Sequence, residues 1–542
     1  MDPHGRRRAT AAAAGLTCVL AAGLWGAAWL LRPRPAAASD VPRPGSAAPA
    51  DPARAPARGA EAPRRRVAPD PALVARIRGR IADFENAAAR ETKGKVGPKS
   101  VAVAVHVLDL DADGELVAIE ADRSMRPASN LKLVTSSAAL VLLGPAFSFE
   151  TVFETQGAVE GGVLAGDLVA RAAGDPLYDR QGDGSLTALL APLVADFARR
   201  GIRRIDGALV LDELDFAEPS PGPAWPDAGQ RWSEFCALAG GFSANAGCLT
   251  ATVRPRGVGE EAEVRVEPRH DGLARKGRVV TGAARSRLDV RVEGRHGQAF
   301  VDGSIPAGVG PWSTRFAAAD PVELFGAAVV RALKDGGIPV RDGWTRAHAT
   351  AAGRWTELGR IVTPIGRVLE AVNTDSNNAC ADQVFLALGH AQGAGGTRAG
   401  GRAAVASALD RLGVSSEGLV QVDGSGLSRD NRVTARQITA LVRAVLRLEP
   451  GTARAFVDSL AVAGETGTLD DRMDDPLLAG NVRAKTGFIA GTSALSGILD
   501  TRDGRRLVFS ILVEYPPTDG LNKRCWKPME NSICKELAGA DG

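Results

Sequence analysis

The 542-residue sequence lacks the features that several large protein classes require. It has 66 Lys and Arg residues against 63 Asp and Glu, and this near balance argues against a dedicated nucleic-acid-binding protein, whose basic face normally shifts the total. No Cys-x-x-Cys pair or His-rich cluster indicates a metal site. No coiled-coil, collagen or short-period repeat pattern is present. We therefore expect a globular protein that needs neither a metal nor a cofactor and binds no nucleic acid.

The N-terminal region differs in composition from the rest of the chain. Three arginines, at positions 6–8, precede an uncharged run over residues 9–31. This run is long enough to cross a bilayer and longer than the usual core of a signal peptide, and the arginines favour a cytoplasmic start. Cleavage near residues 36–39 is the alternative. Both interpretations export the rest of the chain and predict a location in the cell envelope or periplasm, anchored through residues 9–31 if the segment is retained.

The following stretch, residues 32–69, is rich in Ala, Pro and Arg and has almost no large apolar side chain. Such a composition cannot bury enough surface to offset the entropy lost on ordering. We expect an extended, semi-rigid linker.

Five cysteines lie beyond the first 31 residues. Cys236 and Cys248 are close in sequence, as are Cys525 and Cys534. In an oxidising compartment this spacing predicts two local disulfides and a free thiol at Cys380.

Both ends of the exported region show the pattern of one α/β domain. A helix is predicted from Asp70, followed by two strands that flank a turn at residues 111–114. Three more strands are predicted near the C-terminus, within residues 481–515. We expect these strands to form one antiparallel sheet, with helices predicted within residues 368–389 and 434–448 packing against it.

The segment between these ends, residues 149–348, shows mainly short strand-like pieces separated by turns. It predicts inserted accessory domains with little helix. The expected organisation is a catalytic domain from residues 70–148 and 349–542, carrying two nested accessory domains. A glycine-rich stretch over residues 389–404 lacks the Gly-Lys-Ser/Thr of a phosphate-binding loop and is predicted to be a flexible surface loop.

Three short motifs occur in an informative order. Ser129-x-x-Lys132 opens a predicted helix that ends before Gly144-Pro145, and Ser376-x-Asn378 follows. Lys485-Thr486-Gly487 lies on a predicted strand. Each motif alone is weak, but the ordered set is the one used by penicillin-binding proteins and β-lactamases.

Two competing matches show why the order matters. Ser532 and Lys535 repeat the first motif, but they follow the Lys-Thr-Gly element. Ser243 and Asn245 could supply the middle motif, but they lie in the insertion. We therefore favour Ser376 and Asn378.

The residue types suit acyl transfer. A serine hydroxyl becomes a good nucleophile when a neighbour removes its proton, and Lys132 can do so only when neutral. Spacing of three on a helix brings Ser129 and Lys132 to one face. Burial, together with the charge of Lys485, is expected to lower the pKa of Lys132. Ser376 can relay a proton to the departing amine, and the amide of Asn378 can hold both Lys132 and the substrate.

The third motif is suited to binding an extended substrate. Lys485 and Thr486 can hold a terminal carboxylate, and Gly487 leaves room for a peptide along the strand edge. The backbone N–H groups of Ser129 and Phe488 are the candidates for an oxyanion hole.

Around these motifs the sequence resembles the class C low-molecular-mass penicillin-binding proteins, the D-alanyl-D-alanine carboxypeptidase/endopeptidase family. The resemblance covers nearly everything from Asp70 onward, and its blocks include "RPASNLKLVTSSAALVLLGPAFSFET", "GDLVARAAGDPLY", "VDGSGLSRDNRVTARQI" and "AGETGTLDDRM". It implies a transpeptidase-like α/β domain with nested accessory domains. It also implies release of terminal D-alanine from peptidoglycan stem peptides, cleavage of cross-links, and acylation of the serine by β-lactam antibiotics.

Two positions depart from the family pattern. Asn377 stands where the family most often has Asp, and Phe488 stands where it commonly has Thr or Ser. The second change removes a hydroxyl near the expected substrate carboxylate, while the backbone N–H is kept. It bears on substrate preference and rate more than on the type of reaction.

Other functions were weighed against this one. A histidine-based triad would need His106 or His348, but no Gly-x-Ser-x-Gly motif follows a strand. Two roles for Asp423 are equally compatible with the sequence: it could line the active-site cleft, or it could stabilise an ordered turn. Asp175 is predicted to lie in a structural turn. A non-catalytic envelope protein of the same fold, which binds peptidoglycan or partners, is the main alternative, with Phe488 as its support. A β-lactamase or esterase is a lesser one.

Overall fold

The computed structural model describes most of the chain beyond residue 68, in the ranges 69–112, 114–178, 186–269, 272–295, 298–349 and 352–539. The expected anchor at residues 9–31, and the linker up to residue 68, lie outside these ranges. In the described part of the chain, no helix is both long enough and apolar enough to cross a bilayer.

Helix α1, Pro71–Glu91, forms as its sequence predicts. The Asp70 carboxylate accepts a hydrogen bond of 2.8 Å from the Ala72 N–H, and Pro71 occupies the first helical position. Leu73, Ile77 and Ile81 are buried in one core with the central sheet. The helical spacing of apolar residues therefore correctly identified its buried face.

The central sheet is antiparallel throughout and is assembled from both ends of the chain, as predicted. Its six strands, in spatial order, are β18 (Ala461–Val462), β19 (Val482–Ile489), β20 (Thr492–Asp500), β21 (Arg506–Glu514), β1 (Ala102–Asp109) and β2 (Gly114–Ile119).

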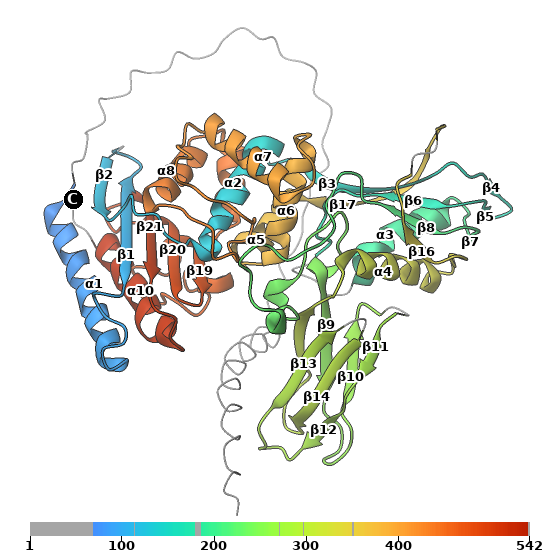
Figure 1. The fold of residues 1–542 in the computed structure, drawn as a ribbon, viewed down its shortest axis with the longest axis horizontal. Helices are drawn as coiled ribbons and strands as arrows, with labels where there is room; N and C mark the ends of the chain where they lie inside the picture. Colours follow the sequence, from blue (N-terminus) through green and yellow to red (C-terminus); the bar gives the residue numbers. More distant parts are fainter. Residues whose placement is uncertain are drawn as a thin grey trace, which may run out of the picture.

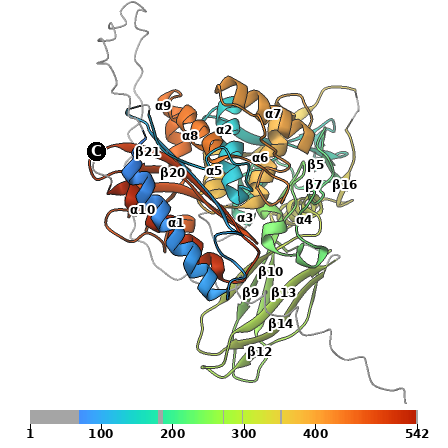
Figure 2. The ribbon, with the colours of Figure 1, turned by 60° about the vertical axis from the view of Figure 1, so that its left-hand side comes forward.

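Helices cover both faces of this sheet (Figures 1 and 2). Helix α1 and the C-terminal helix α10 (Lys527–Ala538) share one core with it. A second core on the other face is built largely by α2 (Leu131–Leu143), α5 (Ile365–Asn373), α6 (Asn378–Ala391), α7 (Arg398–Arg411), α8 (Ala435–Leu446) and α9 (Pro450–Asp458). This three-layer arrangement confirms the predicted α/β fold class.

The glycine-rich stretch forms close helix packing rather than a flexible loop. Residues 389–391 end α6, and residues 398–404 belong to α7. Only a short turn separates the two helices. A Cβ at Gly400 would lie 2.0 Å from the Gly395 carbonyl oxygen, and one at Gly401 would lie 2.5 Å from that of Phe385. The glycines let the two helices approach closely, so the surface-loop prediction is wrong.

The insertion contains several sheets to one side of the central sheet (Figure 1). A five-stranded sheet has the order β16 (Trp344–Arg346), β8 (Leu209–Asp212), β6 (Leu168–Arg171), β3 (Ser148–Thr155) and β17 (Thr356–Pro364), and beside it β4 (Val159–Glu160), β5 (Val163–Leu164) and β7 (Arg204–Ile205) form a small sheet. Two further sheets comprise β10 (Glu263–Glu267), β9 (Cys248–Arg254) and β15 (Trp312–Ala317), and β11 (Ala274–Lys276), β14 (Gln298–Pro306), β12 (Val279–Gly282) and β13 (Asp289–Arg295).

The insertion has more helix than the sequence pattern predicts. Helices α3 (Leu186–Arg199) and α4 (Pro321–Asp335) share a core with its sheets. The start of α4 carries a local sequence signal, because Asp320 caps the helix through the N–H groups of Val322 and Glu323.

The two predicted disulfides are absent, since all five cysteines in the described residues are free thiols. Cys525 lies in a π-helical turn that continues into α10, where Cys534 lies. Nine residues at 1.5 Å per residue separate their Cα atoms by about 13 Å, roughly twice the reach of a disulfide. Burial raises the pKa of Cys236 to about 12 and that of Cys248 to about 11, which disfavours the thiolate that disulfide formation needs.

A buried ion pair holds α10 to the rest of the domain. Arg472 donates to the Glu530 carboxylate at 3.0 Å, and Ser493 of β20 donates to the same carboxylate at 2.6 Å. Arg472→Ala would leave the Glu530 charge buried and uncompensated, so we expect a loss of about 3–5 kcal/mol in the free energy of unfolding. Denaturation followed by circular dichroism measures it.

The matched control for this loss is Arg454→Ala, because Arg454 is 83% exposed and pairs with Asp458 one helical turn away. Its expected cost is at most about 0.5 kcal/mol. Equal losses for the two variants would contradict the assignment of the Arg472 pair as a major stabilising contact.

Candidate active site

Three side chains predicted from the first two motifs, those of Ser129, Lys132 and Asn378, meet at the N-terminal end of α2. Lys132 Nζ lies 3.0 Å from Ser129 Oγ and 2.6 Å from Asn378 Oδ1. A third contact, 2.7 Å long, joins Lys132 Nζ to the carbonyl oxygen of Ser425. Lys132 is fully buried, whereas Ser129 is half-buried.

This geometry fixes the direction of the lysine nitrogen. The Ser425 carbonyl oxygen and Asn378 Oδ1 can only accept hydrogen bonds, so each takes one N–H of Lys132. The remaining position on Nζ faces Ser129 Oγ. In the neutral lysine that position is the lone pair, and it is directed at the serine proton.

Burial is the main cause that lowers the pKa of Lys132, to about 8. Asp382 and Asp423 oppose this shift. The sequence prediction that Lys485 also lowers the pKa of Lys132 is not supported. Instead, burial and the neighbouring Lys132 lower the pKa of Lys485 well below its usual value.

A strained turn positions Ser129. It belongs to the 3-10 turn Ala128–Asn130, in which Ala128 has a φ of 46°. Gly426 packs directly on this turn, and a Cβ there would lie 1.9 Å from the Ala128 carbonyl oxygen. No side-chain cap is formed by Ser129 at the start of α2. The serine is therefore placed by tertiary packing and not by a helix-capping role.

The middle motif begins α6 after a tight turn. Ser376 has a φ of 63°, which is unusual for a residue other than glycine. Asn378 Nδ2 donates at 2.8 Å to the carbonyl oxygen of Phe235, in the short helix Glu234–Cys236 of the insertion. This bond fixes the amide so that Oδ1 faces Lys132. In the described residues, no hydrogen bond joins the Ser376 hydroxyl to Lys132 or Ser129.

The third motif lies on β19, beside the 3-10 turn that contains Ser129. Asn130 Nδ2 donates to the Lys485 carbonyl oxygen at 3.0 Å, and a Cβ at Gly487 would lie 2.9 Å from the carbonyl oxygen of Pro127. Lys485 Nζ donates to the carbonyl oxygen of Thr486 at 2.9 Å. The glycine therefore allows close approach of the turn to the strand.

One edge of β19 is open next to this motif. Its neighbour β18 pairs only with Arg483 and Ala484. The Val482 carbonyl accepts from Ala463 on that side, and because backbone groups alternate along a strand, Phe488 also directs its N–H toward the open edge. The Phe488 side chain is 56% exposed.

The competing motifs have other surroundings. Lys535 forms an ion pair with Asp475 at 2.8 Å and lines, with Ser532, a separate cavity of about 280 Å³. Asn245 donates to the backbone of Cys248. Neither Lys535 nor Asn245 contacts Lys132 through these interactions.

Two further candidate residues have structural roles. The Asp423 carboxylate accepts from Trp225, Asn431 and the backbone of the loop that contains it, which supports the structural-turn interpretation. His106 is buried, and its ring nitrogens contact the side chains of Thr439, Glu115 and Arg436, none of which is a serine.

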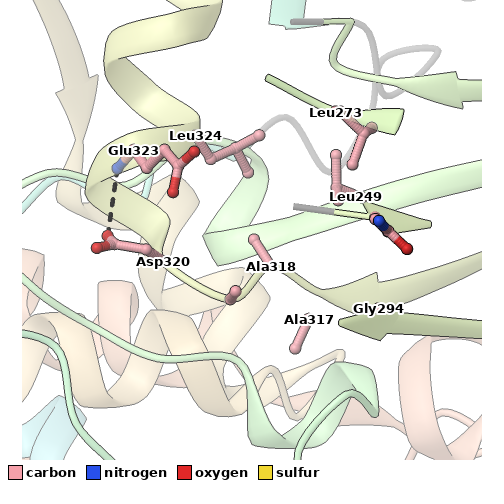
Figure 3. Close-up of a pocket in the computed structure, with 10 residues that line it drawn as sticks. Leu249, Leu273, Gly294, Ala317, Ala318, Asp320, Glu323 and Leu324 are labelled. Atoms are coloured by element: carbon pink, nitrogen blue, oxygen red, sulfur yellow. Dashed lines mark hydrogen bonds between the residues drawn. The ribbon is translucent and has the colours of Figure 1, made fainter. Parts of the chain in front are cut away.

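A small cavity of about 30 Å³ in the insertion is a poor alternative site (Figure 3). Asp320 is one of the polar residues that line it, and its carboxylate already caps α4 through the N–H groups of Val322 and Glu323. Leu249, Leu273 and Leu324 provide an apolar wall. The cavity is too small for a peptide.

Four contributors escaped the sequence analysis: Asn130, Phe235, Asp382 and Ser425. Asn130 lies inside the first motif, and Ser425 lies in the block "VDGSG", which already resembled the family. Phe235 acts through its backbone carbonyl, so no side-chain pattern could have identified it.

Comparisons with known proteins agree on one family. The model described as "D-Ala-D-Ala carboxypeptidase 3 (S13) family" matches residues 88–530. The chain is 31% identical over 432 residues to the D-alanyl-D-alanine carboxypeptidase of Actinomadura sp. (strain R39), covering 75% of this chain and 77% of the relative.

Solved structures show a similar fold. Penicillin-binding protein 4 (dacB) from Haemophilus influenzae has a TM-score of 0.68 at 24% identity, over 82% of this chain and 98% of that one. The same protein complexed with a novel β-lactam has a TM-score of 0.63 at 23% identity, with the same coverage.

Proposed function

The chain belongs to the D-Ala-D-Ala carboxypeptidase 3 (S13) family, and on that premise we propose that Ser129 is its nucleophile and Lys132 its general base. The enzyme is a serine-type D-Ala-D-Ala carboxypeptidase/endopeptidase that acts on peptidoglycan. The observation that carries the assignment of residues is the contact of Lys132 Nζ with both Ser129 Oγ and Asn378 Oδ1.

The first half of the reaction forms an acyl-enzyme. The Ser129 proton passes to the neutral Lys132, and Oγ attacks the carbonyl carbon between the two D-alanines. The N–H groups of Ser129 and Phe488 hold the resulting oxyanion. When the C–N bond breaks, the departing amine takes a proton from Lys132 through Ser376. Water then repeats the attack on the ester and releases the shortened peptide.

Lys485 and Thr486 are proposed to bind the terminal carboxylate of the substrate, with the peptide laid along the open edge of β19. Lys485 is buried, and its Nζ donates to a backbone carbonyl rather than to a carboxylate. An arriving carboxylate would supply the missing negative charge and favour the ammonium form. Gly487 leaves this approach free of a side chain.

We further propose that penicillins acylate Ser129, as substrate mimics, and that neither a metal nor another cofactor takes part. Residues 70–148 and 349–542 are proposed as the catalytic domain and 149–348 as the accessory insertion, although β17 joins the insertion sheet past that boundary. The family acts on the cell wall, which places the enzyme in the envelope. Residues 9–31 are proposed to anchor it to the membrane.

Mass analysis of digested peptidoglycan tests this function. The purified protein should remove a single alanine from pentapeptides, or split cross-linked dimers, and penicillin should block both reactions. A fluorescent penicillin should remain covalently attached to Ser129 after denaturation. Binding of intact peptidoglycan without either product or an adduct would favour the non-catalytic alternative.

The oxyanion role of Phe488 is tested by a pair of variants. Phe488→Pro removes the backbone N–H at an open strand edge, where proline is best tolerated. We expect a loss of about 10²–10³-fold in the rate of penicillin acylation. Phe488→Ala keeps the N–H and should retain acylation to within about tenfold. Similar losses in both variants would mean that the side chain, and not the N–H, is what acylation needs.

A further inference from the structure

Asp382 is a buried carboxylate that the proposed mechanism does not use. It lies on α6, one helical turn beyond Asn378, and is only 7% exposed. Its Oδ1 accepts from the Gly424 N–H at 2.7 Å and from the Ser425 N–H at 3.0 Å. Its Oδ2 is buried without a hydrogen-bond partner. A buried, half-satisfied carboxylate is costly, so it calls for an explanation.

These bonds fix the backbone that touches the general base. The peptide plane between Gly424 and Ser425 is held on one side by Asp382 and on the other by Thr135, whose hydroxyl donates to the Gly424 carbonyl at 2.8 Å. The next carbonyl, that of Ser425, accepts from Lys132 Nζ. The position of one acceptor of the lysine thus depends on Asp382.

Asp382 also acts on Lys132 through its charge. Its carboxylate raises the pKa of Lys132 against the larger effect of burial. Burial and Asp423 raise the pKa of Asp382 itself to about 7, while Lys132, a hydrogen bond with the Ser425 side chain and Arg398 oppose that rise.

The other ionisable groups that face Lys132 come from three elements. Asp423, from the loop after α7, and Cys380, from α6, both act to raise its pKa. Lys485, from β19, is close enough for Lys132 to lower the pKa of Lys485. Asp423 is engaged by four donors, whereas the two N–H groups that Asp382 accepts both bind its Oδ1.

We propose that Asp382 is a positioning residue for the general base: it holds the Gly424–Ser425 backbone so that Lys132 Nζ is aimed at Ser129, and its charge sets how readily Lys132 releases a proton. This inference rests on the proposed roles of Ser129 and Lys132. It adds a carboxylate to a site whose three motifs contain none.

The test is the pH dependence of penicillin acylation in Asp382→Asn. The asparagine keeps an acceptor for the two N–H groups but removes the charge. We expect the acidic limb of the profile to move to lower pH by about one unit, since a close opposite charge shifts a pKa by about 1–3 units. In Asp382→Ala, which loses both hydrogen bonds, the plateau should fall at least about tenfold as well.

The matched control is Asp430→Asn, which also removes one carboxylate charge. Asp430 is exposed and lies in the loop that contains Gly424 and Ser425. Its limb should coincide with that of the wild type, because solvent screens the charge. An unshifted limb in Asp382→Asn, with acylation still at Ser129, would overturn the inference and leave the proposed function standing. Acylation at another residue would instead overturn the proposed function.

A second variant covers the case in which Asp382→Asn does not fold. Asp382→Glu retains the charge but displaces the carboxylate, so it should lower the plateau about tenfold and leave the limb near its wild-type position. A wild-type plateau in this variant would contradict the positioning role.

Discussion

Ser129→Ala is expected to form no covalent adduct with penicillin and to release D-alanine on the order of 10⁵–10⁶-fold more slowly than the wild type, because Ser129 Oγ is the hydroxyl that Lys132 Nζ contacts. Lys132→Arg should cause a loss of similar size. The guanidinium keeps the positive charge but cannot be deprotonated, so it cannot accept the serine proton. The measurement is burst labelling with a fluorescent penicillin, together with single-turnover release of D-alanine from a peptide.

The control for both variants is Ser532→Ala, which alters the other Ser-x-x-Lys sequence. Lys535 is 49% exposed and paired with Asp475, so this variant should label and turn over like the wild type. Persistent labelling of Ser129→Ala, or its loss in Ser532→Ala, would show that the wrong serine has been assigned.

Acylation should rise with pH through the pKa of Lys132, which burial lowers to about 8. The base must be neutral, so the rate should fall about 50-fold between pH 8, where half of the lysine is neutral, and pH 6, and should approach a tenfold fall per pH unit below that. The rate rises with pH because Lys132 loses its proton as the pH rises, and its lowered pKa increases the neutral fraction of this lysine at neutral pH. An unperturbed lysine would place the same limb about two units higher.

Stopped-flow acylation by a chromogenic β-lactam between pH 5 and pH 10 measures this profile. The denaturation midpoint, recorded over the same range, separates loss of the fold from protonation of the base. A rate that is flat between pH 6 and pH 8, in a protein that stays folded, would rule out Lys132 as the base.

Several features of the fold could be predicted because they depend on local chemistry. Helix α1 begins directly after Asp70 because a carboxylate cap and a proline are local signals, and strands β1 and β2 follow from two apolar runs that flank a turn. The glycine-rich stretch misled the prediction, because glycine permits both flexible loops and close helix packing. The choice between them depends on what lies opposite, which here is α6. The cysteines misled it for a related reason: spacing of nine residues allows a disulfide in a loop but forbids it along a helix.

For the site, the order of three motifs in the sequence was enough to identify the family and the reaction, since each motif supplies a side chain of a chemistry that acyl transfer needs. What the motifs could not predict is how Lys132 is held. Ser425 and Phe235 act through backbone carbonyls, which every residue possesses, and Asp382 acts on a loop 42 residues away. Only the tertiary structure brings these groups together, because the position of a backbone acceptor, and the burial that lowers the pKa of Lys132, are properties of packing and not of residue type.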